Sequence, residues 1–259
     1  MKFFLFTTIP AFLTVEKSEW GYLGSNGPAY WHQLNETYAT CKSNNQQTPI
    51  DLKVEDFAKP TKIELDVIKQ TDLILLNNGH TYQVQRSEGT IDKPALYEDA
   101  TLKVDGETYY LLQYHFHMPS EHHIEGRDLL LEGHWVFKTS SDQNAKFAVL
   151  GVFFDLGERE DPGLKSIVDI INEKPLGANE HVNISISLSE QIFKSVRTVC
   201  IYALLTTPPC TEGIRWFVSQ DVQSISPPQF RSLKYVLKYN SRFTQKRLDG
   251  GEPTSNEPP

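Results

Sequence analysis

The stretch from residue 113 to residue 123, QYHFHMPSEHH, alternates polar and aromatic side chains over its first five residues. Successive side chains of an extended strand point to opposite faces. Gln113, His115 and His117 would therefore share one face, while Tyr114 and Phe116 would share the other. The pattern predicts a strand that aims two imidazoles at one point, in a sheet that carries a site on one face.

A second strand-like run, residues 131–137 (LEGHWVF), places Glu132, His134 and Val136 on one face by the same rule. If this run pairs with the first, three imidazoles converge. Three neutral imidazoles suit zinc, and a catalytic zinc site keeps its fourth position open for water. Gln113 and Glu132 each precede a candidate ligand by two residues, so they are natural partners for the second ring nitrogens.

The other histidines fit this pattern less well. His-x-His also occurs by chance on surface strands, so the residues alone leave a metal site and structural histidines as open alternatives. His122 and His123 are adjacent and would face opposite ways on a strand. We expect a structural hydrogen-bonding role for His122, as for His32 and His181, and a surface position for His123.

Most of the remaining chain has strand-like patterns, with Asp105-Gly106 as a hairpin turn. Two helices are predicted by period, one after Pro162 and one after the cap Ser226-Pro227-Pro228. The prediction is a mainly β, single-domain protein with a central, mostly antiparallel twisted sheet and a few peripheral helices. The expected strands are residues 63–67, 73–76, 82–84, 133–137, 148–154 and 199–205, and the expected helical apolar positions are Leu164, Ile167, Val168, Ile171, Phe230, Leu233, Val236 and Leu237.

Charge and the chain ends limit the partners. The 259 residues carry a formal net charge of -8, which argues against nucleic acid because phosphate binding needs a concentrated positive surface. Residues 1–17 have one early lysine and a short apolar run, and are interpreted as a signal peptide, with a buried N-terminal strand as the alternative. We expect the catalytic domain over 18–248, a disordered polar tail over 249–259, and no membrane span.

At this point the sequence resembles the α-class carbonic anhydrases, in the form of their bacterial, plant and microbial-eukaryote members. Residues 113–123 and 131–135 resemble the zinc site of that family, and the similarity runs nearly the whole length of the chain. The other matching stretches are residues 20–22 (WGY), 27–31 (GPAYW), 45–51 (NQQTPID), 78–82 (NGHTY), 148–151 (AVLG), 205–216 (LTTPPCTEGIRW) and 240–242 (NSR).

The resemblance implies a role for each matching residue. His115, His117 and His134 would bind Zn²⁺, with Gln113, Glu132 and the backbone near Asn240 orienting them. Thr206 would accept a hydrogen bond from zinc-bound hydroxide and donate to Glu121, and His80 would shuttle protons. The wall that holds carbon dioxide would comprise Val136, Val149, Leu205, Thr207 and Trp216.

The implied activity is reversible hydration of carbon dioxide to bicarbonate, inhibited at zinc by sulfonamides or anions, in a monomer or homodimer. Cys41 and Cys210 match positions that secreted members join in a disulfide, which leaves Cys200 unpaired. Together with the leader and two sequons, at Asn35 and Asn183, this favours secretion.

The sequence departs from the family pattern at two places, and the first of them predicts a reduced catalytic rate. Residues 201–204 read Ile-Tyr-Ala-Leu where the family usually has Tyr-x-Gly-Ser, so either Ile201 replaces that tyrosine or Tyr202 shifts into its place. Phe243 follows Arg242 where proline is common. The rival interpretations are a carbonic anhydrase-like binding module with weak or no catalysis, and a zinc esterase.

Overall fold

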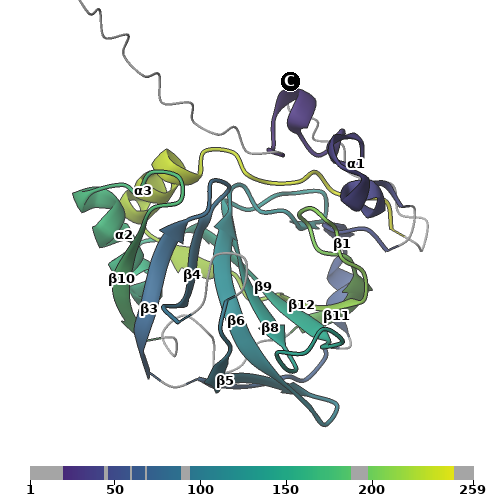
Figure 1. Ribbon diagram of the computed structural model, residues 1–259, viewed down its shortest axis with the longest axis horizontal. Helices are drawn as coiled ribbons and strands as arrows, with labels where there is room; N and C mark the ends of the chain where they lie inside the picture. Colours follow the sequence, from purple (N-terminus) through teal and green to yellow (C-terminus); the bar gives the residue numbers. More distant parts are fainter. Residues whose placement is uncertain are drawn as a thin grey trace, which may run out of the picture.

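A computed structural model describes residues 20–43, 46–58, 60–67, 69–88, 94–187 and 198–247. Within these residues, eleven strands form one large sheet and two short strands form another. The main path of the large sheet runs, in spatial order, through β10 (His181–Ser187), β3 (Lys69–Asn77), β4 (Tyr82–Arg86), β6 (Glu107–His117), β8 (Leu131–Lys138), β9 (Phe147–Leu156), β12 (Ile214–Ser219) and β11 (Thr198–Ala203) (Figure 1).

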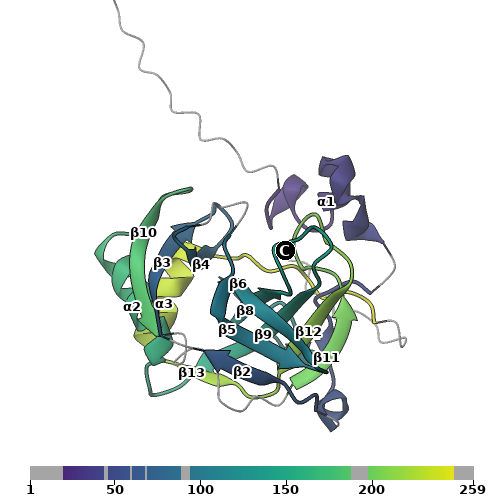
Figure 2. The ribbon, with the colours of Figure 1, turned by 60° about the horizontal axis from the view of Figure 1, so that its bottom comes forward.

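Neighbouring strands of the sheet are mostly antiparallel. The exceptions among the described pairs are β12 and β13 (Gln223–Ile225), which both run parallel to β9. β5 (Tyr97–Val104) pairs with β6 and with β2 (Glu64–Val67), and Figure 2 shows β5 and β2 side by side. The separate small sheet pairs β1 (Asp51–Leu52) with β7 (His123–Ile124). The prediction of a mainly β, mostly antiparallel fold is confirmed.

The turn between β5 and β6 has the sequence Asp105-Gly106, and both residues have positive φ, 51° and 78°. A two-residue turn of this kind twists the chain in the sense that antiparallel strands need, and aspartate and glycine tolerate it best. This hairpin, predicted from the sequence, sets the start of β6. The strand that carries His115 and His117 therefore begins at a fixed register.

Both predicted helices are present and both pack their apolar stripe against the core, although Phe230 and Val236 of the second helix are only half-buried. α2 (Pro162–Glu173) buries Leu164, Ile167, Val168 and Ile171, as the period predicted. α3 (Pro227–Leu237) starts at a capping box in which Ser226 and Gln229 satisfy each other's backbone amides. The two helices lie together beside β10 and β3, on the opposite side of the molecule from the short α1 (Trp31–Leu34). Short 3-10 helices cover Gly24–Asn26 (η1), Glu36–Lys42 (η2) and Val54–Ala58 (η3).

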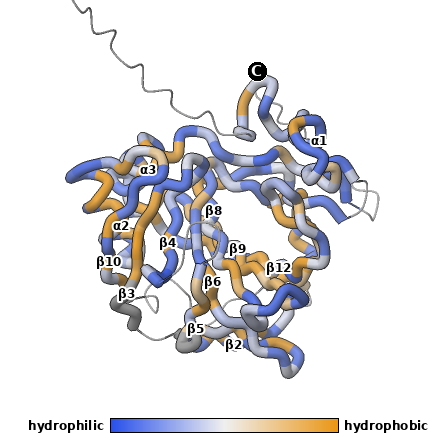
Figure 3. Tube along the Cα trace, in the orientation of Figure 1, coloured by the Kyte–Doolittle hydropathy of each residue, from blue (hydrophilic) through white to orange (hydrophobic). Residues whose placement is uncertain are grey.

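The two faces of the central strands differ in composition. One face, with Tyr114, Trp135 and Leu150, belongs to the large core that α2 and α3 close. The other face, with Val136 and Val149, belongs to a smaller apolar cluster. Figure 3 shows β9 and β12 as predominantly apolar strands at the centre of the molecule.

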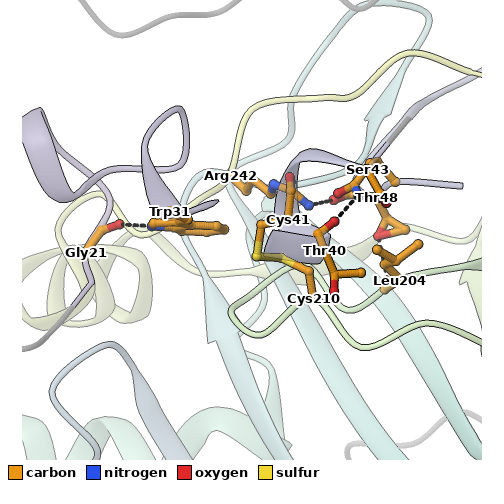
Figure 4. Close-up of a disulfide and its surroundings, with 10 residues drawn as sticks. Gly21, Trp31, Thr40, Cys41, Ser43, Thr48, Leu204, Cys210 and Arg242 are labelled. Carbon is orange, nitrogen blue, oxygen red and sulfur yellow. Dashed lines mark hydrogen bonds between the residues drawn. A yellow bond between two sulfur atoms is a disulfide. The ribbon is translucent and has the colours of Figure 1, made fainter. Parts of the chain in front are cut away.

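Strand β11 ends at Ala203, two residues before the predicted end. The chain turns there, and the amide of Leu205 donates to the carbonyl of Thr211 at 3.0 Å. A disulfide joins Cys210, at the end of this turn, to Cys41, as predicted (Figure 4). Cys200 is the free cysteine. Within the described residues, no helix has the length and apolar character needed to cross a bilayer.

Candidate metal centre

Three histidines on two paired strands face one another. β6 and β8 pair so that His115 lies directly opposite His134 and His117 lies opposite Glu132. Directly opposed residues of an antiparallel pair share a face, so the register brings the three imidazoles together. Nε2 of His115 lies 3.0 Å from Nε2 of His117, and one nitrogen of each of the three rings lies within 4.8 Å of the others.

The remaining nitrogen of each ring faces a hydrogen-bond acceptor. Nδ1 of His115 lies 2.9 Å from Oε1 of Gln113, and Nδ1 of His117 lies 2.8 Å from the carbonyl oxygen of Asn240. Nε2 of His134 lies 2.8 Å from Oε1 of Glu132. Because all three partners are acceptors, each ring must donate its proton there and present a lone pair to the other two rings.

Burial keeps the rings of His115 and His117 neutral. His117 and His134 are each 1% exposed, and His115 is half-buried. Burial, with the neighbouring imidazoles, lowers the pKa of His115 well below its usual range and the pKa of His117 to about 3. Three lone pairs that converge without a proton repel one another, and a soft or borderline cation is the group that relieves this.

Zinc fits this arrangement. Zinc–imidazole bonds of about 2.0–2.1 Å in tetrahedral geometry separate ligand nitrogens by about 3.3 Å, close to the spacing of the converging nitrogens. His122, Glu132 and His134 also lie close enough together for a metal. In that second group the atoms that face each other are occupied by hydrogen bonds, at 2.8 Å for both histidine–glutamate pairs. The group of His115, His117 and His134 is therefore the candidate centre.

Glu132 is the acceptor on which this part of the site depends. The fully buried carboxylate accepts from the rings of His122 and His134 and from the backbone amides of Glu121 and His122. Burial alone would raise the pKa of Glu132, but the electrostatic attraction and the hydrogen bonds of the His122 and His134 rings outweigh it and hold the pKa well below its usual range. The predicted structural role of His122 is thus present in the fold.

Glu121 lies beside the converging nitrogens. Its Oε1 accepts from the backbone amide of Arg242 at 2.8 Å and lies 3.4 Å from Nδ1 of His117. Its Oε2 lies 3.9 Å from Nδ1 of His134 and has no partner at strict hydrogen-bond geometry. Burial raises the pKa of Glu121 to about 7, against the charge of His134 and the Thr206 hydrogen bond, both of which lower it.

The predicted apolar wall lies on the same face of the sheet. Val136 pairs with Val149, and Val149 pairs with Trp216 across β9 and β12, so the three form one row. Leu205 packs against the same cluster, and Thr207 is half-buried in the turn after Thr206. The Trp216 ring centroid lies 4.9 Å from that of His134, so this wall borders the candidate centre.

His80 lies between β3 and β4 and stacks on Trp20, with ring centroids 3.6 Å apart and planes 4° apart. Its backbone carbonyl accepts from the Asn240 side chain at 3.2 Å, and Asn240 also provides the carbonyl that orients His117. Burial lowers the pKa of His80 to about 4. His80 is thus tied to the candidate centre through one residue, but its ring is held as a weak base.

The comparisons with known proteins agree with this geometry. The model of the eukaryotic-type carbonic anhydrase family matches residues 26–250. The chain belongs to the α-carbonic anhydrase family.

Individual members of the family match nearly end to end. A carbonic anhydrase of Pectobacterium atrosepticum is 32% identical over 231 residues, 89% of this chain and 88% of that protein. The α-carbonic anhydrase of Thermovibrio ammonificans, solved in complex with sulfanilamide, superposes with a TM-score of 0.72 at 34% identity and covers 87% of this chain and 94% of its own. A fungal α-carbonic anhydrase from Aspergillus oryzae gives a TM-score of 0.77 at 28% identity, over 91% and 96% of the two chains.

The structure shows how residues 201–204, which depart from the α-carbonic anhydrase pattern, face the sheet. β11 pairs with β12 so that Ile201 lies opposite Trp216 and Tyr202 lies opposite Arg215. Ile201 packs into the apolar cluster beside Trp216, while Tyr202 is 56% exposed. Of these two residues Ile201 is therefore the one that faces the Trp216 cluster, and Nε2 of the buried His122 has no hydrogen-bond partner among the described residues.

The expectation of a surface position for His123 is wrong. Its side chain is only 5% exposed, in the short strand β7 that pairs with β1. His32 is half-buried and His181 is exposed at the edge strand β10. Alternation along a strand predicts that adjacent side chains point to opposite faces. It does not predict whether either face is exposed to solvent.

Sequence reasoning missed a positioning role for Gly151. This residue lies opposite His134 across β8 and β9. A Cβ added at Gly151 would stand 3.0 Å from Oε1 of Glu132 and 3.9 Å from Cδ2 of His134. Because Gly151 has no side chain, it leaves room for the contact between Glu132 and His134. The glycine was visible in the motif at residues 148–151, but only the strand register shows what it faces.

Proposed function

We propose that this chain catalyses the reversible hydration of carbon dioxide at a zinc ion held by His115, His117 and His134. The observation that carries the proposal is the convergence of three ring nitrogens that carry no proton. The second nitrogen of each ring donates its proton to a fixed acceptor. Zinc, when bound, supplies the positive charge that lets a water ionise near neutral pH. Gln113, Glu132 and the Asn240 carbonyl fix the three rings in the required tautomers.

Glu121 and Thr206 orient the attacking oxygen in this proposal. An ionised carboxylate can only accept hydrogen bonds, so Thr206 donates its proton to Glu121 and its oxygen is left to accept from the nucleophile. The raised pKa of Glu121, about 7, applies to the chain without a cation nearby. A divalent cation beside the carboxylate favours its ionised form, so metal binding and the acceptor role of Glu121 support each other.

The apolar wall receives the substrate. Val136, Val149, Leu205 and Trp216 offer carbon and ring surfaces next to the candidate centre, which suits a molecule without a net charge or dipole. The indole Nε1 of Trp216 donates to the Leu204 carbonyl at 2.9 Å, so it does not compete for substrate oxygens. Bicarbonate, in contrast, loses its hydration against this wall, and its departure is favoured.

His80 is proposed to pass the released proton to buffer. A base with a pKa of about 4 is neutral at pH 7 and accepts a proton only against an unfavourable gradient. We therefore expect turnover to depend strongly on buffer concentration even with His80 present. The check compares wild type and His80→Ala in dilute and concentrated imidazole-type buffer. Equal turnover of the two proteins in dilute buffer would remove His80 from this role.

The deciding experiment is stopped-flow carbon dioxide hydration on protein of measured zinc content, with and without sulfanilamide. We propose that a zinc-directed sulfonamide binds here, as in the Thermovibrio ammonificans complex. Zinc-dependent, sulfanilamide-sensitive hydration is the expected result. Stoichiometric zinc without hydration would contradict the enzyme and favour a binding module.

The proposal includes the compartment and the extent of the domain. The Cys41–Cys210 disulfide is of a kind that persists in oxidising compartments, which supports secretion of a catalytic domain over residues 18–248. The proposed leader, residues 1–17, and the tail, residues 249–259, lie outside the described residues. Sequencing the mature N-terminus after expression in a secreting host tests the leader, since a retained Met1 would contradict it.

A further inference from the structure

A cavity of about 510 Å³ lies beside the disulfide, between α1, η2 and the segment that follows Asn240. Its basic lining residues are His32, Lys42, Arg242, Lys246 and Arg247. Among the described residues that line it, none is aspartate or glutamate, although the chain as a whole has 33 acidic and 25 basic residues. The cavity is therefore a positively charged region on an acidic protein.

Arg242 forms the buried part of this cavity and is 2% exposed. Its Nη1 donates to the Thr48 carbonyl and its Nη2 to the Cys41 carbonyl, both at 2.7 Å, and the guanidinium lies 5.5 Å from the centre of the Trp31 ring. Figure 4 shows the side chain between Trp31 and Thr48, alongside the disulfide. Within the described residues no carboxylate forms an ion pair with this guanidinium, so its direct partners are two backbone carbonyls and a ring, and Glu121 acts on its charge only at longer range.

Burial of the charged Arg242 guanidinium costs free energy. Burial lowers the pKa of Arg242 to about 10, against the attraction of Glu121, which raises it. Glu121 accepts from the backbone amide of Arg242 rather than from the guanidinium. A buried cation without a matched anion is destabilising, and an anion brought close to it recovers part of that free energy.

The other basic side chains contribute unequally. Arg247 is paired with Asp56, with Nη2 3.0 Å from Oδ1, so its charge is largely neutralised. Lys42 is exposed at the cavity, and its charge adds to burial in lowering the pKa of His32. The excess positive charge therefore comes chiefly from Arg242 and Lys42.

We propose that this cavity is a binding site for a small organic oxyanion, a phosphate monoester or a dicarboxylate. The positive lining selects the charge, and carboxylate and phosphate are the anions that lysine and arginine recognise. The volume lies within the range of about 300–1,000 Å³ that small-molecule sites occupy and leaves room for a carbon skeleton. The site is separate from the candidate metal centre and does not depend on the proposed function.

Isothermal titration with glycerol 3-phosphate and with succinate tests the site, with sodium chloride at matched ionic strength as the reference. Both metal-loaded and chelator-treated protein are titrated, since an anion captured by the metal binds only the first. We expect saturable binding of at least one probe in both forms. The probe that binds more tightly distinguishes the phosphate from the dicarboxylate.

The variant Lys42→Glu/Lys246→Glu reverses two exposed charges at the cavity and is expected to weaken binding at least about tenfold. Lys174→Glu reverses a single exposed charge on the far side of the molecule, and should bind like wild type. Circular dichroism verifies that both variants fold. Binding no tighter than chloride, binding confined to metal-loaded protein, or an unchanged dissociation constant in the double variant would overturn the proposal.

Discussion

The two faces of strands β6, β8 and β9 are built from alternate residues of the same segments, yet they have opposite chemistry. On one face Tyr114, Trp135 and Leu150 are almost completely buried among other apolar side chains. On the other, His115, His134 and Glu132 are surrounded by hydrogen-bond partners and bordered by a smaller apolar cluster. The first face gains free energy by excluding water, and the second holds polar groups in a fixed geometry at some cost in free energy. Substitutions on the first face should therefore change mainly the stability, and substitutions at alternate positions, on the second face, should change mainly the activity.

The largest expected difference between the two faces is between substitutions at the adjacent residues 134 and 135. His134→Ala leaves two imidazoles, too few for the proposed zinc site, so zinc content and carbon dioxide hydration should both fall to background. Metal analysis and stopped-flow hydration measure the two losses. Stoichiometric zinc with undiminished turnover in this variant would contradict the assignment of His134.

Trp135→Ala should have the converse effect. The side chain is 1% exposed and stacks on Tyr114 at 5.7 Å, so its removal creates a cavity in the main core. We expect the free energy of unfolding to drop by about 3–5 kcal/mol while the folded protein keeps its zinc. Denaturant unfolding and metal analysis provide the test, and loss of zinc at unchanged stability would refute the separation of the two faces.

The polar face should also make the free energy of unfolding depend on pH. The pKa of Glu121 is raised from 4.5 to about 7 in the fold, so the folded metal-free chain binds this proton more tightly than the unfolded chain. The stabilising contribution is full below pH 4.5 and is lost as pH rises to about 7, a change of about 3 kcal/mol at 1.36 kcal/mol per pKa unit. Glu121→Gln should flatten that slope in denaturant unfolding of chelator-treated protein, and an unchanged slope would show that another group causes it.

A methyl group at either of two glycines should affect only the face that it enters. Gly151→Ala places a Cβ 3.0 Å from Glu132 Oε1, so we expect zinc affinity to fall roughly 10–100-fold, as when an orienting partner is disturbed. Gly133→Ala places a Cβ 2.7 Å from the Trp135 ring and should instead lower stability. Competition with a chromophoric chelator measures the affinity, and an equal loss of zinc affinity in both variants would contradict the comparison.

The smallest expected effect concerns the unpartnered Nε2 of His122. Its Nδ1 donates to Glu132, so Nε2 presents a lone pair next to Trp216, at a ring centroid distance of 5.0 Å. Ile201 lies opposite Trp216, and a tyrosine there could donate to that lone pair. Ile201→Tyr should be more stable than Ile201→Phe, which lacks the hydroxyl, by about 1 kcal/mol in denaturant unfolding. Equal stability of the two variants would show that the hydroxyl does not reach His122.

The alternation of residues 113–117 and 131–137 was enough to assign the two strands, the shared face and the candidate ligands, because parity on a strand is a local property of the chain. The same holds for the Asp105-Gly106 turn and for the stripe of α2, whose periods of two and 3.6 residues need no tertiary information. The resemblance to a known family added Glu121, Thr206 and the Cys41–Cys210 pair, which lie too far apart in sequence for any local rule.

Only the tertiary structure decided which residues meet across distance. It placed the Asn240 carbonyl on His117, Gly151 against Glu132, and Ile201 rather than Tyr202 beside Trp216. It also buried His123 and gathered Arg242, Lys42 and Lys246 around one cavity. These contacts depend on strand register and loop packing, which are set by the sum of many weak interactions over the whole chain, whereas the alternation of a strand is set by the geometry of its own backbone.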